Sequence, residues 1–422
     1  MRRVAIVVSC CVGLGVLSQA AWAQDRKAGV DDVSVRAGQG AIEWIEPTAD
    51  LRYRYEFVDQ DGFDQDAHAS TMRARLGIRI KPVQSVSLFA ESEAVVHLGP
   101  DRINDTTNGV VGRPVVADPE DLVLNQIYAR WAPRSGADII VGRQVVNYDN
   151  QRWVGSVGWR QNDQTLDAVT ASVDGVAKAK LRASYGHAWR VNRVFGPDSP
   201  QGVWDHSDIH MVRAGADPKA IGTVTAYGYW LDIPNAPAFS SRTFGVRLAG
   251  NRVLGSGAAK FTYAFEYAGQ SPHGSNSGDA SHNYWLVEPG MALGATSIKL
   301  GYERLGGNGQ TALQTPLATL HAFNGWADKF LTTPSTGLRD LYLDFGYTVP
   351  GEVGLLAKTG IRVVYHDFRS TIGDLHYGRE YNASIARPLF APLLLTLKLA
   401  SYDAEQFGPD TTKAWVQLDA RF

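Results

Sequence analysis

The fold is decided by a run of nine residues in which every second side chain is apolar, Met72-Arg73-Ala74-Arg75-Leu76-Gly77-Ile78-Arg79-Ile80. Successive side chains of an extended strand point to opposite faces of a sheet, so one face here is apolar and the other largely cationic. This period of two predicts a β-strand. A soluble β-sandwich has the same alternation, so the run alone does not say what surrounds the sheet.

The segment that follows continues the alternation and supplies acidic residues. After the connection 81–85, apolar residues again occupy every second position from Val86 onward. A hairpin that pairs Ile80 with Val86 sets apolar side chains opposite each other on one face and arginines opposite glutamates on the other. The predicted pairs are Ile78–Leu88, Leu76–Ala90, Arg75–Glu91 and Arg73–Glu93.

The same rhythm recurs to the end of the chain. We predict eighteen strands at 49–59, 69–80, 85–98, 121–132, 137–148, 164–174, 178–189, 207–216, 222–232, 240–250, 259–269, 281–293, 296–305, 338–348, 358–368, 375–386, 393–403 and 412–422. Links after even-numbered strands are mostly short, whereas all the long links follow odd-numbered strands: 99–120, 149–163, 190–206 and 306–337. Outer-membrane barrels show this asymmetry, with short periplasmic turns and longer extracellular loops. The predicted fold class is all-β, a transmembrane antiparallel β-barrel of about 18 strands.

The N-terminal residues predict export. Arg2 and Arg3 precede an apolar run, and Ala21-Trp22-Ala23 forms a small-residue cleavage site, so we predict a signal peptide over 1–23. A lipoprotein signal ending at Cys10 is an alternative, but Cys10 lies in the middle of the apolar run. We assign 24–48 to a periplasmic pre-barrel segment, either a plug or an extra turn beneath the barrel, and 49–422 to the barrel.

Composition agrees with this destination. Both cysteines lie in the predicted signal peptide, and its removal leaves a net charge of −4, which does not suggest a nucleic-acid partner. After the signal peptide, the most apolar stretch is 389–400, and Pro392 and Lys398 interrupt it. A chain without a hydrophobic helix can cross a membrane only as a closed barrel.

The final strand predicts the route of assembly. Apolar residues alternate with polar or aromatic ones over 413–422, and the chain ends in Phe422 on the lipid-facing side. A C-terminal phenylalanine resembles the signal by which outer-membrane proteins are handed to the barrel assembly machinery. We therefore expect localisation in the outer membrane of a Gram-negative bacterium. Its lipid and that machinery are the expected partners, and we expect a monomer.

An eighteen-stranded barrel leaves an aqueous lumen, where inward charges cost little and set selectivity. By strand parity the inward arginines are Arg52, Arg54, Arg73, Arg75, Arg130, Arg182, Arg213, Arg247, Arg362 and Arg379. The expected lumen charge ladder comprises Arg73, Arg75, Glu91, Glu93 and Arg130. A purely structural role, in which acids neutralise the arginines, is the main alternative for any one of them.

The most distinctive segment is GRQVVNYDNQRWVGSVGWRQN at 142–162, which continues into TLDAV at 165–169. It carries three arginines and two tryptophans: Arg143, Arg152, Arg160, Trp153 and Trp159. A loop of this composition that folds inward would narrow the pore and pair charge with flat rings suited to sugars. We predict these five as substrate-binding residues.

These motifs resemble the alginate export family of Gram-negative outer-membrane channels. A second stretch, HAFNGWADKF at 321–330 through GLRDLY at 337–342, is also similar to that family. The resemblance implies an eighteen-stranded, monomeric channel whose arginine-lined constriction passes alginate out of the cell. It implies positions at or near the constriction for Arg143, Arg152 and Arg160, which stand in the shared motif.

The sequence leaves three candidate functions. The leading one is passive passage of anionic or sugar-like solutes, with export of an alginate-like polysaccharide as its family-derived form, and the second is an uptake porin for small nutrients. A barrel enzyme is disfavoured, because Asn276 stands where a nucleophile elbow needs serine. His206 and His210 lie roughly 13 Å apart along a strand, too far to share a metal. We expect no cofactor and no metal.

The long link 306–337 is rich in aromatic and charged residues, including Trp326, Asp328 and Lys329. We predict that it folds into or over the pore mouth as a gate. Ordinary packing of an extracellular loop is an equal alternative.

Overall fold

The computed structural model describes residues 44–100, 102–133, 136–176, 181–218, 220–255, 259–351 and 354–422. The predicted signal peptide and nearly all of the pre-barrel segment lie outside the described residues. Within the described part, no helix has the length and apolar character needed to cross a membrane.

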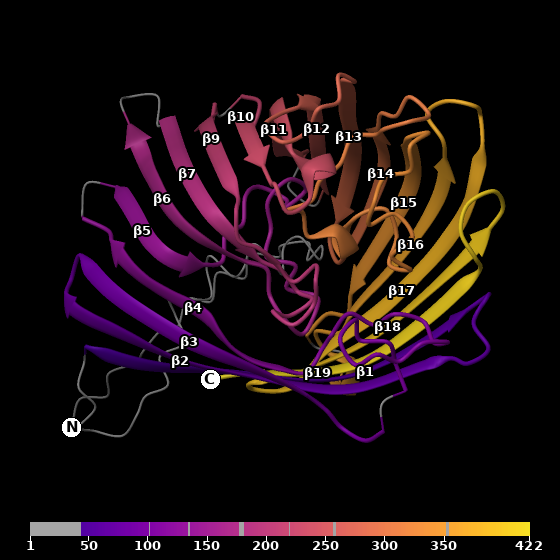
Figure 1. Ribbon diagram of the computed structural model, residues 1–422, viewed down its shortest axis with the longest axis horizontal. Helices are drawn as coiled ribbons and strands as arrows, with labels where there is room; N and C mark the ends of the chain where they lie inside the picture. Colours follow the sequence, from indigo (N-terminus) through magenta and orange to yellow (C-terminus); the bar gives the residue numbers. More distant parts are fainter. Residues whose placement is uncertain are drawn as a thin grey trace.

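The strands form one closed antiparallel sheet. β1 pairs with β2 on one side and with β19 on the other, which closes the ring (Figure 1). β8 has only two residues and pairs with β7 in the loop before β9, so the barrel wall has eighteen long strands. The strands are β1 Ile45–Gln60, β2 Ala67–Val83, β3 Val86–His97, β4 Asp121–Trp131, β5 Ala137–Gln144, β6 Thr165–Val176, β7 Leu181–Asn192, β8 Val203–Trp204, β9 Asp208–Ala216, β10 Thr223–Asp232, β11 Ser241–Leu254, β12 Ala259–Pro272, β13 His282–Leu293, β14 Thr296–Leu305, β15 Leu338–Thr348, β16 Gly360–Arg369, β17 His376–Phe390, β18 Leu393–Ala404 and β19 Thr411–Arg421. Short 3₁₀ turns occupy Pro237–Phe239, Leu320–Ala322 and Gly354–Leu356.

The predicted fold class is confirmed, and each of the eighteen predicted strands overlaps an observed one. β5 differs most, because it ends at Gln144 rather than at 148. The Gln144 side-chain amide donates hydrogen bonds to the carbonyl oxygens of Ile140 (3.3 Å), Gly142 (3.3 Å) and Ala168 (3.1 Å). These bonds fold the amide back onto the strand end, and the chain then turns into the barrel.

The predicted register of the first hairpin is wrong by two residues. β2 continues to Val83, a two-residue turn follows, and an irregularity between Ile80 and Val83 pairs Ile80 with Leu88. Arg75 therefore lies opposite Glu93 rather than Glu91. A shift of two residues keeps every side chain on its predicted face, so the lumen and lipid faces are unchanged.

Burial is inverted relative to a soluble protein. Leu76, Ile78 and Leu88 are 59%, 42% and 46% exposed on the outside of the wall, whereas Arg54 and Arg73 are completely buried inside. In a hydrocarbon environment every backbone group must pair within the sheet, which a closed barrel achieves. The exposed apolar face therefore contacts lipid, and the chain is a transmembrane barrel.

We expect Leu76→Arg to destabilise the inserted barrel by about 2–4 kcal/mol, because Leu76 lies midway along β2 on the lipid face. Urea titration of the protein folded into vesicles, followed by gel mobility, measures this change. Ser184→Arg is the matched control, since Ser184 lines the lumen cavity and its replacement leaves the cation in water. Equal losses of stability in the two variants would contradict the assignment of faces.

Candidate functional site

Two long links fold into the interior of the ring (Figure 1), and their side chains join a buried apolar cluster with the wall. The links 145–164 and 306–337, here called the inner loops, meet inside the ring. Gly155 donates its backbone N–H to the Leu317 carbonyl at 2.8 Å, and Thr319 donates its own to the Gln151 carbonyl at 3.1 Å. Because 18-stranded barrels otherwise leave an open channel, these loops narrow the lumen.

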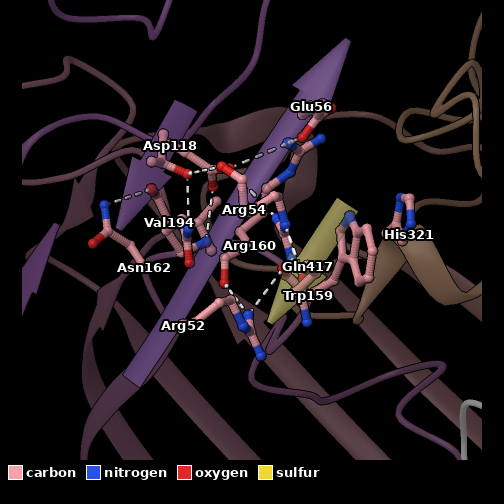
Figure 2. A network of polar contacts seen from close by, with 12 residues as sticks. Arg52, Arg54, Glu56, Asp118, Trp159, Arg160, Asn162, Val194, His321 and Gln417 are labelled. Carbon is pink, nitrogen blue, oxygen red and sulfur yellow. Dashed lines mark hydrogen bonds and ion pairs between the residues drawn. The ribbon is translucent and has the colours of Figure 1, made fainter. Parts of the chain in front are cut away.

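Arginines of β1 hold the first inner loop against the wall. Arg52 donates from Nη1 to the carbonyls of Gly158, Trp159 and Arg160 at 3.1–3.2 Å, and its Nε binds Asp419 at 2.7 Å. Arg54 donates to the Trp159 carbonyl, and its guanidinium lies 4.2 Å from the centre of the Trp159 ring (Figure 2). These wall arginines therefore bind the loop itself.

Asp328 joins the two inner loops to the wall. Its carboxylate accepts hydrogen bonds from Arg160 at 3.0 Å, from Lys413 at 2.9 Å and from His321 Nδ1 at 2.6 Å. Burial alone would raise the pKa of Asp328, but His321, Lys413 and Arg160 hold it well below its ordinary value. The carboxylate is thus ionised, and we call this group with its three partners the Asp328 latch.

His321 connects the latch to a buried lysine. Lys398 of β18 lies with Nζ 2.5 Å from His321 Nε2, and the His321 ring stacks on Trp159 at 4.6 Å between centroids. Because Lys398 donates a hydrogen bond to Nε2 and Asp328 accepts one from Nδ1, the imidazole is neutral and carries its proton on Nδ1. Lys398 Nζ also lies within 4.0 Å of the ring centres of Trp159 and Trp326, so aromatic faces surround the cation.

We expect docking of the inner loops to weaken as pH falls below about 6.5. Burial and the Lys398 charge lower the pKa of His321 well below its ordinary value of about 6.5, despite the opposing pull of Asp328. An undocked loop then binds one proton more than a docked one between the two pKa values, which costs about 1.4 kcal/mol per pH unit. Channel opening in planar bilayers should rise between pH 7 and pH 5, and His321→Gln should flatten the response. A wild-type response that is flat over this range contradicts the prediction.

Arg152 and Trp153 reach the opposite wall. Arg152 contacts Glu303 at 2.9 Å and donates to Asn324 Oδ1 at 3.0 Å, and Trp153 donates from Nε1 to Glu266 at 2.7 Å. Both side chains are buried, and Trp153 belongs to an apolar cluster that includes residues of both inner loops. They anchor the first loop to β12 and β14.

Below the loops lies a cavity of about 1060 Å³. It reaches from Phe422 and the turn ends of the strands to residues 147–151 and 322–326 of the inner loops. Tyr148, Phe323, Trp326 and Tyr342 contribute aromatic surface to it. Since the short turns of such barrels face the periplasm, the cavity is a vestibule on that side.

The charges of this vestibule are balanced by ion pairs. Each of the arginines that follow lines the cavity and has a carboxylate within reach: Arg130–Asp138 (2.9 Å), Arg182–Asp217 (2.8 Å), Arg213–Asp149 (2.7 Å), Arg247–Glu266 (2.6 Å), Arg362–Asp344 (3.0 Å) and Arg421–Asp50 (3.2 Å). Each pair offers both hydrogen-bond donors and acceptors to a solute. The wall is therefore polar without a large field of one sign.

The structure separates the five residues of the motif that were predicted to bind substrate together. Arg143 pairs in register with Ile127, which is exposed on the outer face, and its guanidinium is held by Asp167 at 2.6 and 3.1 Å. It does not line the vestibule. Four other residues of the motif are buried or half-buried inside the barrel: Arg152, Trp153, Trp159 and Arg160.

The expected lumen ladder does face inward, with different partners. Arg75 binds Glu93 and also Asp163 at 2.9 Å, while Arg73 binds Asp50. Glu91 instead accepts hydrogen bonds from Asn125 and Gln126, and Arg130 binds Asp138. Arg379 was assigned inward by parity, which is wrong. It lies opposite Asp367 and is 43% exposed on the outer face, because it has the same parity along β17 as the exposed Tyr381 and Ile385.

The predicted gate loop folds inward. Trp326 is buried, Asp328 forms the latch and Lys329 donates to the Gln60 side-chain oxygen at 3.0 Å. The wall groups that receive the loops, Lys398, Glu266 and Glu303, were not among the residues predicted from the sequence. Lys398 carried a usable signal, since it is a lone cation in the most apolar stretch of the mature chain.

Comparison with known proteins agrees with this architecture. A family model described as alginate export matches residues 43–318, a range that includes the motif at 142–169. No curated protein sequence matches the chain.

Several solved structures share the fold. OpdK of Pseudomonas aeruginosa with vanillate has a TM-score of 0.67 at 14% identity, covering 89% of this chain and 98% of that one. OccK9 (OpdG) of the same organism has a TM-score of 0.70 at 14% identity, covering 91% and 100%. OccAB4 of Acinetobacter baumannii has a TM-score of 0.68 at 14% identity, covering 90% and 99%. At these identities the likeness concerns the fold.

Proposed function

The chain belongs to the alginate export family. We propose that it is an outer-membrane channel for passive passage of anionic or sugar-like solutes, and that the solute it exports is an alginate-like polysaccharide. The observation that carries the proposal is the vestibule, an open polar space lined by arginine–carboxylate pairs and aromatic rings. It ends against two inner loops anchored by the family motif.

The chemistry of the vestibule suits hydroxylated carboxylates. An arginine that gives one or two N–H groups to an acid keeps others for a solute carboxylate, and its acidic partner accepts hydrogen bonds from hydroxyl groups. Flat rings such as Tyr148 and Trp326 offer apolar faces to sugar rings. Conduction needs binding that is favourable enough to admit a solute and weak enough to release it, and neutralised arginines provide this balance.

The motif residues act through the loops in this proposal. Arg152, Trp153, Trp159 and Arg160 fix the inner loops, which close the outer end of the vestibule. A chain-like substrate can pass only after these loops move aside. Selectivity then depends on the vestibule arginines, and Arg143 lies outside this path.

We expect wild-type channels to prefer anions weakly, and Arg182→Ala and Arg213→Ala to shift the preference toward cations. Both arginines line the vestibule and are partly exposed, so each removes one positive charge from the path. The reversal potential under a salt gradient in planar bilayers measures the shift. Arg143→Ala is the control and should match wild type. A cation-preferring wild type that the two lumen substitutions leave unchanged would refute the proposal.

An uptake porin for small nutrients is the second candidate. A cavity of about 1060 Å³ is at the upper end of the usual size for a small-molecule site, and one structure with the same fold contains vanillate, a small aromatic carboxylate. Flux into proteoliposomes separates the two candidates. Passage of uronate oligomers favours the polysaccharide channel, whereas passage of monomeric carboxylates alone favours the porin.

A further inference from the structure

A group of histidine and aspartate side chains lies on the outer face of the barrel, away from the lumen. His187 of β7 and His210 of β9 are direct cross-strand partners, and Asp208 is two residues before His210 on the same face. Tyr185 and Val212 share this face and are 43% and 42% exposed. The group thus lies outside the transport path, near the extracellular end of β9.

The three side chains converge on one point. Nε2 of His187 and Nε2 of His210 each lie 3.1 Å from the same oxygen, Oδ1 of Asp208. One ligand atom from each residue lies within 4.8 Å of the other two. The imidazole rings are nearly parallel, at 8° with centroids 4.7 Å apart, so both Nε2 atoms face the carboxylate from the same side of the strand pair.

We propose that His187, Asp208 and His210 form a binding site for a borderline divalent transition-metal ion, with Zn²⁺ as the ion that fits best. Zinc binds imidazole nitrogen and carboxylate oxygen at about 2.0–2.2 Å. Two ligands at that distance and a tetrahedral angle are about 3.3 Å apart, close to the two observed separations of 3.1 Å. Three protein ligands leave a fourth position for water or another exogenous ligand.

A supporting contact orients one of the ligands. The Tyr185 hydroxyl lies 2.8 Å from Nδ1 of His210, which is the ring nitrogen that faces away from Asp208. Metal-binding histidines commonly use the second nitrogen in this way, because the outer hydrogen bond fixes the tautomer and the ring orientation. Asp208 is 63% exposed at the side chain, so an ion in the surrounding water can reach the site.

The pairing explains why the sequence did not reveal this group. Spacing along one strand put His206 too far from His210, and in the structure His206 is 76% exposed and bonds Asp205 instead. The partner of His210 is supplied by β7, across the intervening loop that contains β8.

Zinc titration of the purified full-length protein in detergent, prepared without a histidine tag, tests the proposal. A chromophoric chelator in competition reports affinity and stoichiometry, and we expect one tight equivalent per chain. His187→Ala and Asp208→Asn should weaken binding by at least about tenfold, and Tyr185→Phe by up to about tenfold. Cobalt in place of zinc should give visible absorption bands that the His187→Ala/His210→Ala double variant lacks.

Two controls keep the result interpretable. His282→Ala removes a histidine outside the group, whose Nε2 bonds Thr311, and should bind zinc as wild type does. Heat-dependent gel mobility shows whether each variant is a folded barrel. Zinc binding of equal strength in wild type and in the folded double variant would overturn the proposal, as would a wild type that binds no stoichiometric zinc.

Discussion

A barrel without the second inner loop should conduct about threefold or more above wild type. The change replaces 315–332 with a short glycine–serine linker. Gln314 and Thr333 already hydrogen bond each other at 2.9 and 3.1 Å, so the linker joins two adjacent ends. The removed segment includes Leu317, Trp326 and Phe330 of the lumen cluster, and its loss opens the outer half of the ring along β13–β18. Single-channel conductance in planar bilayers measures the effect.

The control shortens a loop that does not enter the lumen cluster, 273–281, and should leave conductance unchanged. Uptake of neutral oligosaccharides of graded size should show a larger size limit in the first variant only. If both variants conduct as wild type does, the path does not run through the space that the inner loop fills, and the gate proposal fails.

The strands could be predicted because each one carries its own period. Leu76 and Arg75 point to opposite faces whatever residues lie across from them. The number of strands, and which face of each contacts lipid or the lumen, could therefore be predicted from local sequence. The hairpin register was not, since the link 81–85 can be closed either as a five-residue loop or as a two-residue turn with an irregularity. Both connections leave every side chain on the same face of the sheet, so the alternation of apolar residues cannot distinguish them.

The interior contacts could not be predicted for a different reason. Arg54 meets Trp159 and Asp118 across more than sixty residues of sequence, and no local pattern records which loop enters the lumen. The family motif located the first inner loop and the second stretch located the gate loop. The first stretch suggested contact with substrate and the second a gate, whereas their charged residues are largely used by one another and by the wall.

The cost of burying charge explains why some ion pairs fix the loops while others line the vestibule. Inside a narrow lumen a cation without an acid is expensive, and one that is paired rigidifies the chain that carries it. Arg160 and Asp328 therefore hold the two loops together and are poorly suited to bind a passing solute. Vestibule pairs such as Arg182–Asp217 remain in contact with water, and a solute can replace that water at little cost.

The Asp328 latch should be the most sensitive point of the docked state. Asp328→Ala leaves Lys413 buried without a carboxylate, while Arg160 keeps Glu56 at 3.4 Å, and loss of one partner from a buried ion pair costs about 3–5 kcal/mol. That loss should raise the undocked population of the gate loop by roughly two to three orders of magnitude, since about 1.4 kcal/mol is tenfold.

Trypsin provides the readout, because Lys329 is the one lysine or arginine between 306 and 337. In the docked loop Lys329 is tied to Gln60, so cleavage after it requires undocking. We expect Asp328→Ala to be cut there far faster than wild type, with Asp328→Asn between the two. Asp374→Ala removes an acid that is 90% exposed beside Arg339, and it should be cut at the wild-type rate. Equal cleavage of all four proteins would mean that other contacts hold the loop, and the latch would then have no part in gating.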